Sequence, residues 1–162
     1  MTTPILVIDT SYLLELFQVP GHSSLKTTPR IRSQFERAIR AGWRLFVPLP
    51  VVFELANHIA GVRDGGRRKA LAAALNEAVE SSAKTASPWI IIPADHPLNE
   101  LVALCDVFAS TYAREAIGLT DACILEEAKR LRKKYPPSTH KVHIWTLDAS
   151  LKAREPDEEN PA

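Results

Sequence analysis

The chain has 162 residues, and its 20 Lys and Arg nearly balance its 19 Asp and Glu, leaving a formal net charge of +1. Hydrophobic residues make up 46% and charged residues 24%, which is typical of a single globular domain and excludes collagen, coiled coil and wholesale disorder. The balanced charge disfavours nucleic-acid binding over the whole surface, although a local basic patch remains compatible with it. Two cysteines and the lack of a run of about 20 apolar residues predict a cytoplasmic protein without a disulfide scaffold or a membrane span.

The first predicted unit is a strand followed by a helix. Residues 5–8 read Ile-Leu-Val-Ile, a continuous apolar run that is typical of a strand buried on both faces. This strand ends at Asp9, and residues 10–17 are compatible with a helix. A second helix is predicted over 29–41, where apolar residues recur at helical spacing.

The second unit repeats this order. Residues 44–47 predict a strand, and residues 50–60 predict a helix that begins with a proline and carries Glu54 in its first turn. Residues 61–69 contain three glycines and four basic residues, which predicts a loop. An alanine-rich helix is expected over 70–82.

A third strand is predicted over 89–92, followed by a helix. Asp95 or His96 is expected to cap this helix, which would then run to about Glu115. Thr120 is expected to cap the next helix.

The last predicted strand covers 142–147 and ends at Asp148. Residues 1–153 are expected to form a single domain, and the acidic, proline-containing tail 154–162 is predicted to be disordered. Strands separated by helices predict an α/β fold, a three-layer α/β/α sandwich with a mainly parallel central sheet. Binding sites in such sheets form at the carboxyl ends of the strands.

Four acids are placed to reach that edge of the sheet. Asp9 and Asp148 directly follow predicted strands, whereas Glu54 and Asp121 stand in the first turns of helices. Taken singly, each is also explained as a helix cap, a first-turn acid or a turn residue. Two carboxylates 4 Å apart repel by about 4 kcal/mol at an effective dielectric near 20, so such a cluster must protonate or bind cations. Oxygen ligands alone favour Mg²⁺ or Mn²⁺ over zinc.

The segments around these acids form an ordered set. They read Val-Ile-Asp-Thr-Ser-Tyr-Leu-Leu at 7–14, Pro-Val-Val-Phe-Glu-Leu at 50–55, Leu-Thr-Asp-Ala-Cys-Ile at 119–124 and Trp-Thr-Leu-Asp-Ala-Ser-Leu at 145–151. In order and spacing this set resembles the PIN-domain nucleases, which include the VapC-type toxin ribonucleases. The resemblance covers about residues 5 to 151, and it implies a PIN-like fold.

The resemblance also implies roles for particular residues. Asp9, Glu54, Asp121 and Asp148 would line an acidic pocket for one or two Mg²⁺ or Mn²⁺ ions, with Asp9 and Asp121 as the foremost ligands.

Three hydroxyl residues are expected to support that pocket. Thr10, Ser11 and Thr146 would hold the carboxylates by hydrogen bonds. Many relatives carry a further acid two positions after the last aspartate, where this chain has Ser150. The resemblance therefore implies one metal position more firmly than two.

The function implied by the resemblance is metal-dependent hydrolysis of RNA phosphodiester bonds by an endoribonuclease that leaves a 5′-phosphate and a 3′-hydroxyl. A toxin of a type II toxin-antitoxin pair is the first expectation, with RNA as substrate, an antitoxin protein as partner and a homodimer as a further assembly. A housekeeping or defence-associated nuclease and a catalytically silent RNA- or protein-binding module are the alternatives. A haloacid-dehalogenase-like phosphohydrolase would need a second acid where Ser11 stands.

A basic stretch accompanies the acids. Between Lys26 and Ala70, ten basic residues face three acidic ones, a net of +7, and the rest of the chain sums to −6. Such a patch would supply sequence-independent affinity for phosphates, although a solvated helix face explains it equally well. The predicted nucleic-acid contacts are Arg63, Arg67, Arg68 and Lys69.

Overall fold

The structure, a computed structural model, describes residues 2–92 and 98–158. Its centre is a four-stranded sheet in the order β3-β2-β1-β4. The strands are β1 (Thr3–Ile8), β2 (Arg44–Pro48), β3 (Ile90–Ile92) and β4 (His140–Trp145). Each neighbouring pair is parallel, which confirms the mainly parallel sheet expected from the alternating pattern.

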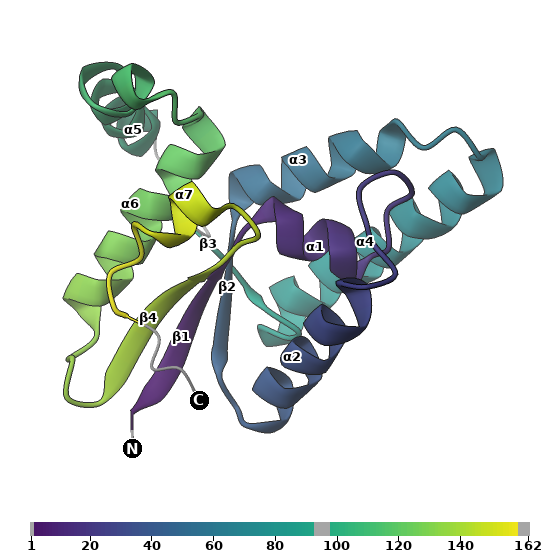
Figure 1. The fold of residues 1–162 in the computed structure, drawn as a ribbon, viewed down its shortest axis with the longest axis horizontal. Helices are drawn as coiled ribbons and strands as arrows, with labels where there is room; N and C mark the ends of the chain where they lie inside the picture. The colour runs from purple at the N-terminus through teal and green to yellow at the C-terminus, as the bar shows by residue number, and fades with distance from the viewer. Residues whose placement is uncertain (1, 93–97, 159–162) are drawn as a thin grey trace.

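Helices cover both faces of this sheet and complete the three layers, as Figure 1 shows with α6 on one side of β1 and β4 and α1 and α2 on the other. The helical elements are α1 (Thr10–Leu16), α2 (Thr28–Arg40), α3 (Leu49–Ala60), α4 (Gly65–Thr85), α5 (Leu98–Ser110), the 3₁₀ helix η1 (Tyr112–Glu115), α6 (Leu119–Lys134) and α7 (Ala149–Lys152). None of the helices in the described ranges is both long and apolar enough to cross a membrane.

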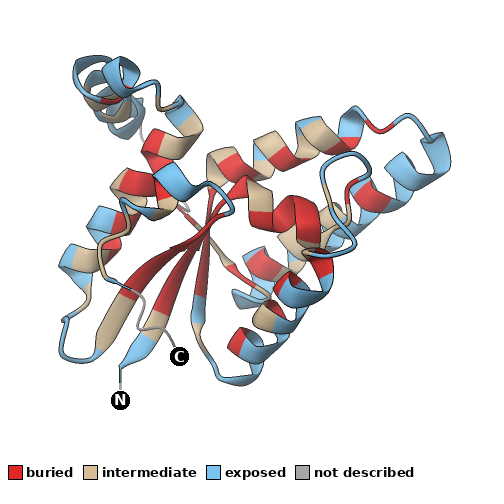
Figure 2. Cartoon of the chain, in the orientation of Figure 1, coloured by how far each residue is buried: buried red, intermediate tan, exposed pale blue. Residues whose placement is uncertain are grey.

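The core is densest toward the carboxyl ends of the neighbouring strands β1 and β4. Residues 5–8 of β1 and 142–145 of β4 are buried, whereas the first residues of both strands are not. Figure 2 shows the same gradient as a change to red along each strand. A rigid, buried scaffold therefore lies directly beneath the edge at which Asp9 follows β1.

Two helix boundaries differ from the prediction. The segment 61–69 is not entirely a loop, because the Asp64 side chain accepts a hydrogen bond from the Arg67 N–H at 2.5 Å and starts α4 at Gly65. The helix expected to reach Glu115 ends at Ser110 and is followed by η1. The caps predicted at 95 and 96 lie outside the described residues.

Glu54 lies in the second turn of α3, not in the first turn as predicted, because the helix already begins at Leu49.

The start of α6 also differs in detail. Gly118 is its N-cap residue, and Thr120 lies inside the first turn. Asp121 also lies in the first turn of α6, close to the helix N-terminus, where the helix dipole favours a negative charge.

Residues 154–158, which were expected to be disordered, lie along the free edge of β4. Glu155 Oε2 accepts the Ile144 N–H at 2.9 Å, and Asp157 Oδ2 accepts the Val142 N–H at 2.8 Å. An edge strand leaves such groups without a neighbouring strand, and these two carboxylates take its place. Residues 159–162 lie outside the described ranges.

Glu155→Gln is expected to lower the free energy of unfolding by about 1–2 kcal/mol near neutral pH. Burial raises the pKa of Glu155, but His143, the Lys152 ammonium and the Ile144 N–H outweigh it, so the pKa lies below its ordinary value. A depressed pKa means that the stabilisation is present above the ordinary glutamate pKa of about 4.3 and is lost as pH falls through the folded-state pKa. Urea unfolding across this pH range measures the loss. The exposed Glu158→Gln is the control, and equal losses in both variants would contradict the assignment.

Candidate metal-binding active site

Asp9 is fixed by hydrogen bonds at the carboxyl end of β1. It is only 7% exposed and caps α1, with Oδ1 accepting the Thr10 N–H at 2.7 Å. Its Oδ2 accepts the hydroxyl of Ser11 at 2.6 Å and that of Thr146 at 2.8 Å. Because β1 and β4 are parallel neighbours, the residues that follow them meet at one edge of the sheet.

The same hydroxyl residues connect Asp9 to the neighbouring acids. The Thr10 hydroxyl donates to Glu54 Oε2 at 2.9 Å, which joins α1 to α3. The Asp148 N–H donates to Thr146 Oγ1 at 2.9 Å. The three side chains that the sequence assigned to support are thus bonded to acids of the predicted pocket.

Asp148 and Asp121 complete the group from two other elements. Asp148 caps α7 by accepting the Ser150 N–H at 2.7 Å and the Leu151 N–H at 3.1 Å. Asp121 comes from the first turn of α6 and is partly buried. Ser150, which stands where many relatives have an acid, contributes its backbone N–H to this cap.

The four acids share one electrostatic environment. Burial raises the pKa of Asp121 to about 6, and the negative charges of Asp9, Glu54 and Asp148 add to the rise. Each of the other three carboxylates is therefore close enough to disfavour ionisation of Asp121. Every charge that shifts this pKa is negative.

The donor set fits a hard divalent cation. Carboxylate and hydroxyl oxygens are the ligands that Mg²⁺ and Mn²⁺ prefer, and a cation would relieve the mutual repulsion of the four acids. In the ranges 2–92 and 98–158, no three His, Cys, Asp or Glu side chains lie close enough to form a ready-made coordination shell. Mg²⁺ commonly uses one or two carboxylates and keeps several waters, so it does not require such a shell.

The basic residues predicted to contact nucleic acid lie elsewhere. Arg67 Nη2 donates to the carbonyls of Phe17 and Gln18 at 3.3 and 3.2 Å, and Arg68 Nη1 donates to the Val62 carbonyl at 2.8 Å. Both guanidinium groups therefore fasten α4 to neighbouring turns. A nucleic-acid role for Arg63, Arg67, Arg68 and Lys69 stays a prediction.

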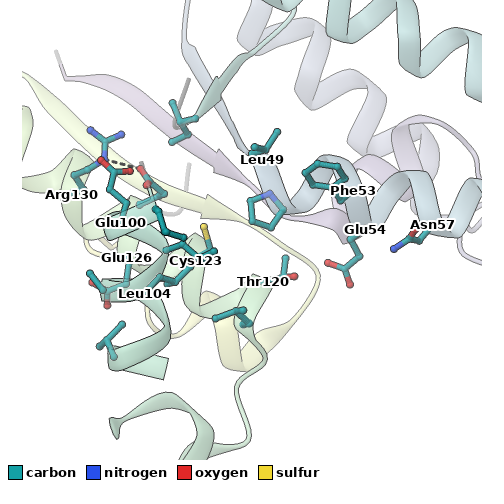
Figure 3. Close-up of a pocket in the computed structure, with 18 residues that line it drawn as sticks. Leu49, Phe53, Glu54, Asn57, Glu100, Leu104, Thr120, Cys123, Glu126 and Arg130 are labelled. Atoms are coloured by element: carbon teal, nitrogen blue, oxygen red, sulfur yellow. Dashed lines mark hydrogen bonds and ion pairs between the residues drawn. The ribbon is translucent and has the colours of Figure 1, made fainter. Parts of the chain in front are cut away.

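An apolar groove that the sequence did not reveal opens beside the acids. It has a volume of about 1230 Å³ and lies between α3, α5 and α6, with Glu54 and Thr120 on its walls (Figure 3). Phe53 on α3 is 63% exposed, and none of the described side chains of α5 is buried. The sequence did carry one sign of this groove, because apolar residues are spread all around the helix from 98 to 110. A helix that packs on one side only needs apolar residues on that side alone, so the others indicate an exposed apolar surface.

Three comparisons with known proteins complete the description. No family model matches the chain, and no curated protein matches it. The crystal structure of FitAcB from Neisseria gonorrhoeae is similar, with a TM-score of 0.58 and 17% sequence identity over 93% of this chain and 92% of that chain. The chain has a PIN-like fold. The likeness extends over nearly the whole PIN-like domain and shows its fold alone.

Proposed function

We propose that this PIN-like domain is a metal-dependent endoribonuclease that hydrolyses RNA phosphodiester bonds with Mg²⁺ or Mn²⁺. The observation that carries the proposal is the hydrogen-bond network that joins Asp9 to Glu54 through Thr10 and to Asp148 through Thr146. The negative charges of these three acids also help to raise the pKa of Asp121. Four clustered carboxylates cost folding free energy unless a cation compensates them. A phosphodiester is a substrate class for which such a cation is commonly used.

The residues of the chain would hold the ion and fix its surroundings. Asp9 and Asp121 are the proposed ligands, and Glu54 and Asp148 complete the acidic wall. The bound ion would supply activation of a water molecule and stabilisation of the charge that develops on the phosphate oxygens. The Ser11 and Thr146 hydroxyls both donate to Asp9 Oδ2 and hold that carboxylate in one orientation. A fixed orientation keeps a metal ligand in place during the reaction.

The hydrogen bond from Ser11 also separates this proposal from a dehalogenase-like phosphohydrolase. That chemistry needs a second acid two positions after Asp9, and Ser11 instead donates a hydrogen bond to Asp9. Ser11 also accepts the Leu147 N–H at 2.9 Å, so both of its hydrogen-bonding functions serve to hold the site together.

Incubation of the purified protein with single-stranded and structured RNA tests the proposal. We expect cleavage in Mg²⁺ or Mn²⁺, no cleavage in EDTA, and products with a 5′-phosphate and a 3′-hydroxyl. Cleavage that persists in EDTA, or the lack of any cleavage with either metal, would contradict it.

Thr146→Val is expected to reduce kcat/KM for RNA about tenfold to a hundredfold, because it removes the hydroxyl that bonds Asp9 and the Asp148 N–H while keeping the side-chain shape. Thr146→Ser retains the hydroxyl and should recover most of the activity. Steady-state cleavage rates measure both effects. Equal activity in the valine and serine variants would remove Thr146 from the site.

A toxin role with an antitoxin partner forms the second part of the proposal. The groove beside the acids is largely apolar, and its lining includes Glu100, Glu126 and Glu127 together with Arg130, which forms an ion pair with Glu127 at 2.7 Å. This surface suits an amphipathic segment with apolar anchors and basic residues, and such a segment would cover Glu54 as it binds. A housekeeping or defence nuclease would have no need of an inhibitor fitted to this groove.

Coexpression with a small protein encoded beside this chain tests the partner. We expect a stable complex that blocks RNA cleavage and that Phe53→Glu dissociates. A second copy of this chain is the competing occupant, since α5 also exposes Leu98, Leu101 and Val102. A homodimer in solution that Phe53→Glu dissociates, with cleavage unaffected by the neighbouring protein, would contradict the antitoxin assignment.

A further inference from the structure

A second hollow, of about 320 Å³, adjoins the acid site on the side of α2. Its walls include Tyr12 on α1, Arg30 and Gln34 on α2, Thr146 and Asp148 after β4, and Lys152 on α7. Thr146 and Asp148 also belong to the acid site, so the hollow lies directly beside that site. Ligand sites commonly begin at about 300 Å³, so the hollow is suited to a single nucleotide.

The hollow carries groups that recognise an anion with polar substituents. Arg30 is exposed, and none of the hydrogen bonds and ion pairs within residues 2–92 and 98–158 uses its guanidinium group. Lys152 adds an ammonium that is held in place by the Ile144 carbonyl at 3.1 Å and Glu155 at 2.8 Å. A guanidinium group is well suited to bidentate hydrogen bonding with a phosphate.

Gln34 adds the capacity to bind a nucleoside. Its Oε1 is buried and accepts no hydrogen bond from the described residues. Buried polar atoms ordinarily have a partner, and a side-chain amide carries donors and an acceptor. A nucleobase, which also presents donors and acceptors, can supply what the amide lacks.

Arg30 is better placed to bind a phosphate at the acid site than Arg67 at the start of α4, because Arg67 contacts Phe17 at the far end of α1. Asp9 lies at the N-terminal end of α1, whereas Arg67 binds the carbonyl of Phe17 at its other end. The seven residues of α1 separate the two by about 10 Å. Arg30 instead lines a hollow that includes Asp148 itself.

We propose that this hollow is a nucleotide subsite, which holds the nucleotide adjoining the scissile phosphate of single-stranded RNA with Arg30 on its phosphate. The RNA assignment rests on the proposed function, whereas the binding of a nucleoside monophosphate does not. The shared chemistry is a phosphate ester on a nucleoside, which either RNA or a free nucleotide provides.

Titration of the isotopically labelled, metal-free protein with UMP and AMP, followed by NMR, tests the subsite. We expect shifts at the Gln34 side-chain amide and the backbone amides of 146–149. Arg30→Gln should weaken the binding about tenfold or more, because it removes a charged hydrogen-bond donor. Arg32→Gln, on the opposite side of α2, is the matched control and should bind like the wild type.

Three results would overturn the subsite: no shifts in this region, equal weakening by Arg30→Gln and Arg32→Gln, or binding of inorganic phosphate as tight as that of UMP and AMP. Displacement of a short fluorescein-labelled single-stranded RNA then identifies the source of the ligand. UMP should displace the RNA from the wild type, and binding of UMP without displacement would overturn the RNA assignment in favour of free nucleotides. Lack of cleavage with any metal, with displacement intact, would instead contradict only the proposed nuclease.

Discussion

Asp9→Asn should lower kcat/KM for RNA cleavage in Mg²⁺ about a thousandfold, the largest effect expected for any single substitution in the chain. A divalent ion stabilises the charge in phosphodiester hydrolysis by several kcal/mol, and each 1.4 kcal/mol corresponds to about tenfold in rate. Asp9 is buried, and Ser11 and Thr146 both donate hydrogen bonds to its Oδ2, so this carboxylate is held in one orientation at the site. Cleavage rates with saturating Mg²⁺ measure the loss.

Asp64→Asn is the matched control for this substitution. Asp64 caps α4 as Asp9 caps α1, and asparagine caps a helix as well as aspartate does. The control removes the same charge at the same helical position away from the acid site, and it should keep the wild-type rate. Similar losses in both variants would show that the effect comes from helix capping or net charge, contrary to the assignment of Asp9.

Asp121→Asn is expected to stabilise the metal-free protein while removing its response to metal. Burial and three neighbouring carboxylates disfavour the charge on Asp121. Removing that charge should raise the free energy of unfolding by about 1 kcal/mol above pH 6, after allowance for screening by solvent at this partly exposed position. Since the pKa is raised in the folded state, the penalty in the wild type grows as pH rises from about 4 to 6.

Thermal unfolding with and without Mg²⁺ measures both effects. The wild type should gain stability with Mg²⁺ because only the folded state brings the ligands together, and Asp121→Asn should gain little. Asp106→Asn, at an exposed position on α5, is the control and should respond to Mg²⁺ like the wild type. A metal-free Asp121→Asn protein that is less stable than the wild type would contradict the repulsion among the acids.

The acids at the strand ends were predictable from the sequence alone. The apolar runs ending at Asp9 and Asp148 predict strands, and parallel neighbours bring their carboxyl ends to one edge. The second of these strands, β4, ends at Trp145, so Asp148 stands three residues beyond it and not directly after it as predicted. Glu54 and Asp121 stand on helices, whose rotation about their axes the pattern does not fix, so the pattern placed them within reach of this edge without showing that they meet the other acids. In the structure, the negative charges of Asp9, Glu54 and Asp148 lie near enough to Asp121 to raise its pKa.

Contacts between distant segments account for what the sequence did not predict. An acidic tail is typical of disorder, but Glu155 and Asp157 are spaced to reach alternate N–H groups of β4, a match that depends on the tertiary register. Likewise, basic residues at the start of α4 look like phosphate ligands until Arg67 is seen to bind the end of α1. Nothing in the sequence distinguishes Arg30 from the other basic residues between Lys26 and Ala70, so its place beside the acid site could not be predicted.

Diffraction from crystals soaked in Mn²⁺, with anomalous scattering to locate the ion, tests the central claim most directly. We expect an ion bound by Asp9 and Asp121, with Glu54 and Asp148 in direct or water-bridged contact, and no ion at this place in Asp9→Asn crystals. An acid site that stays empty at saturating Mn²⁺, or an ion that binds only elsewhere on the protein, would contradict it.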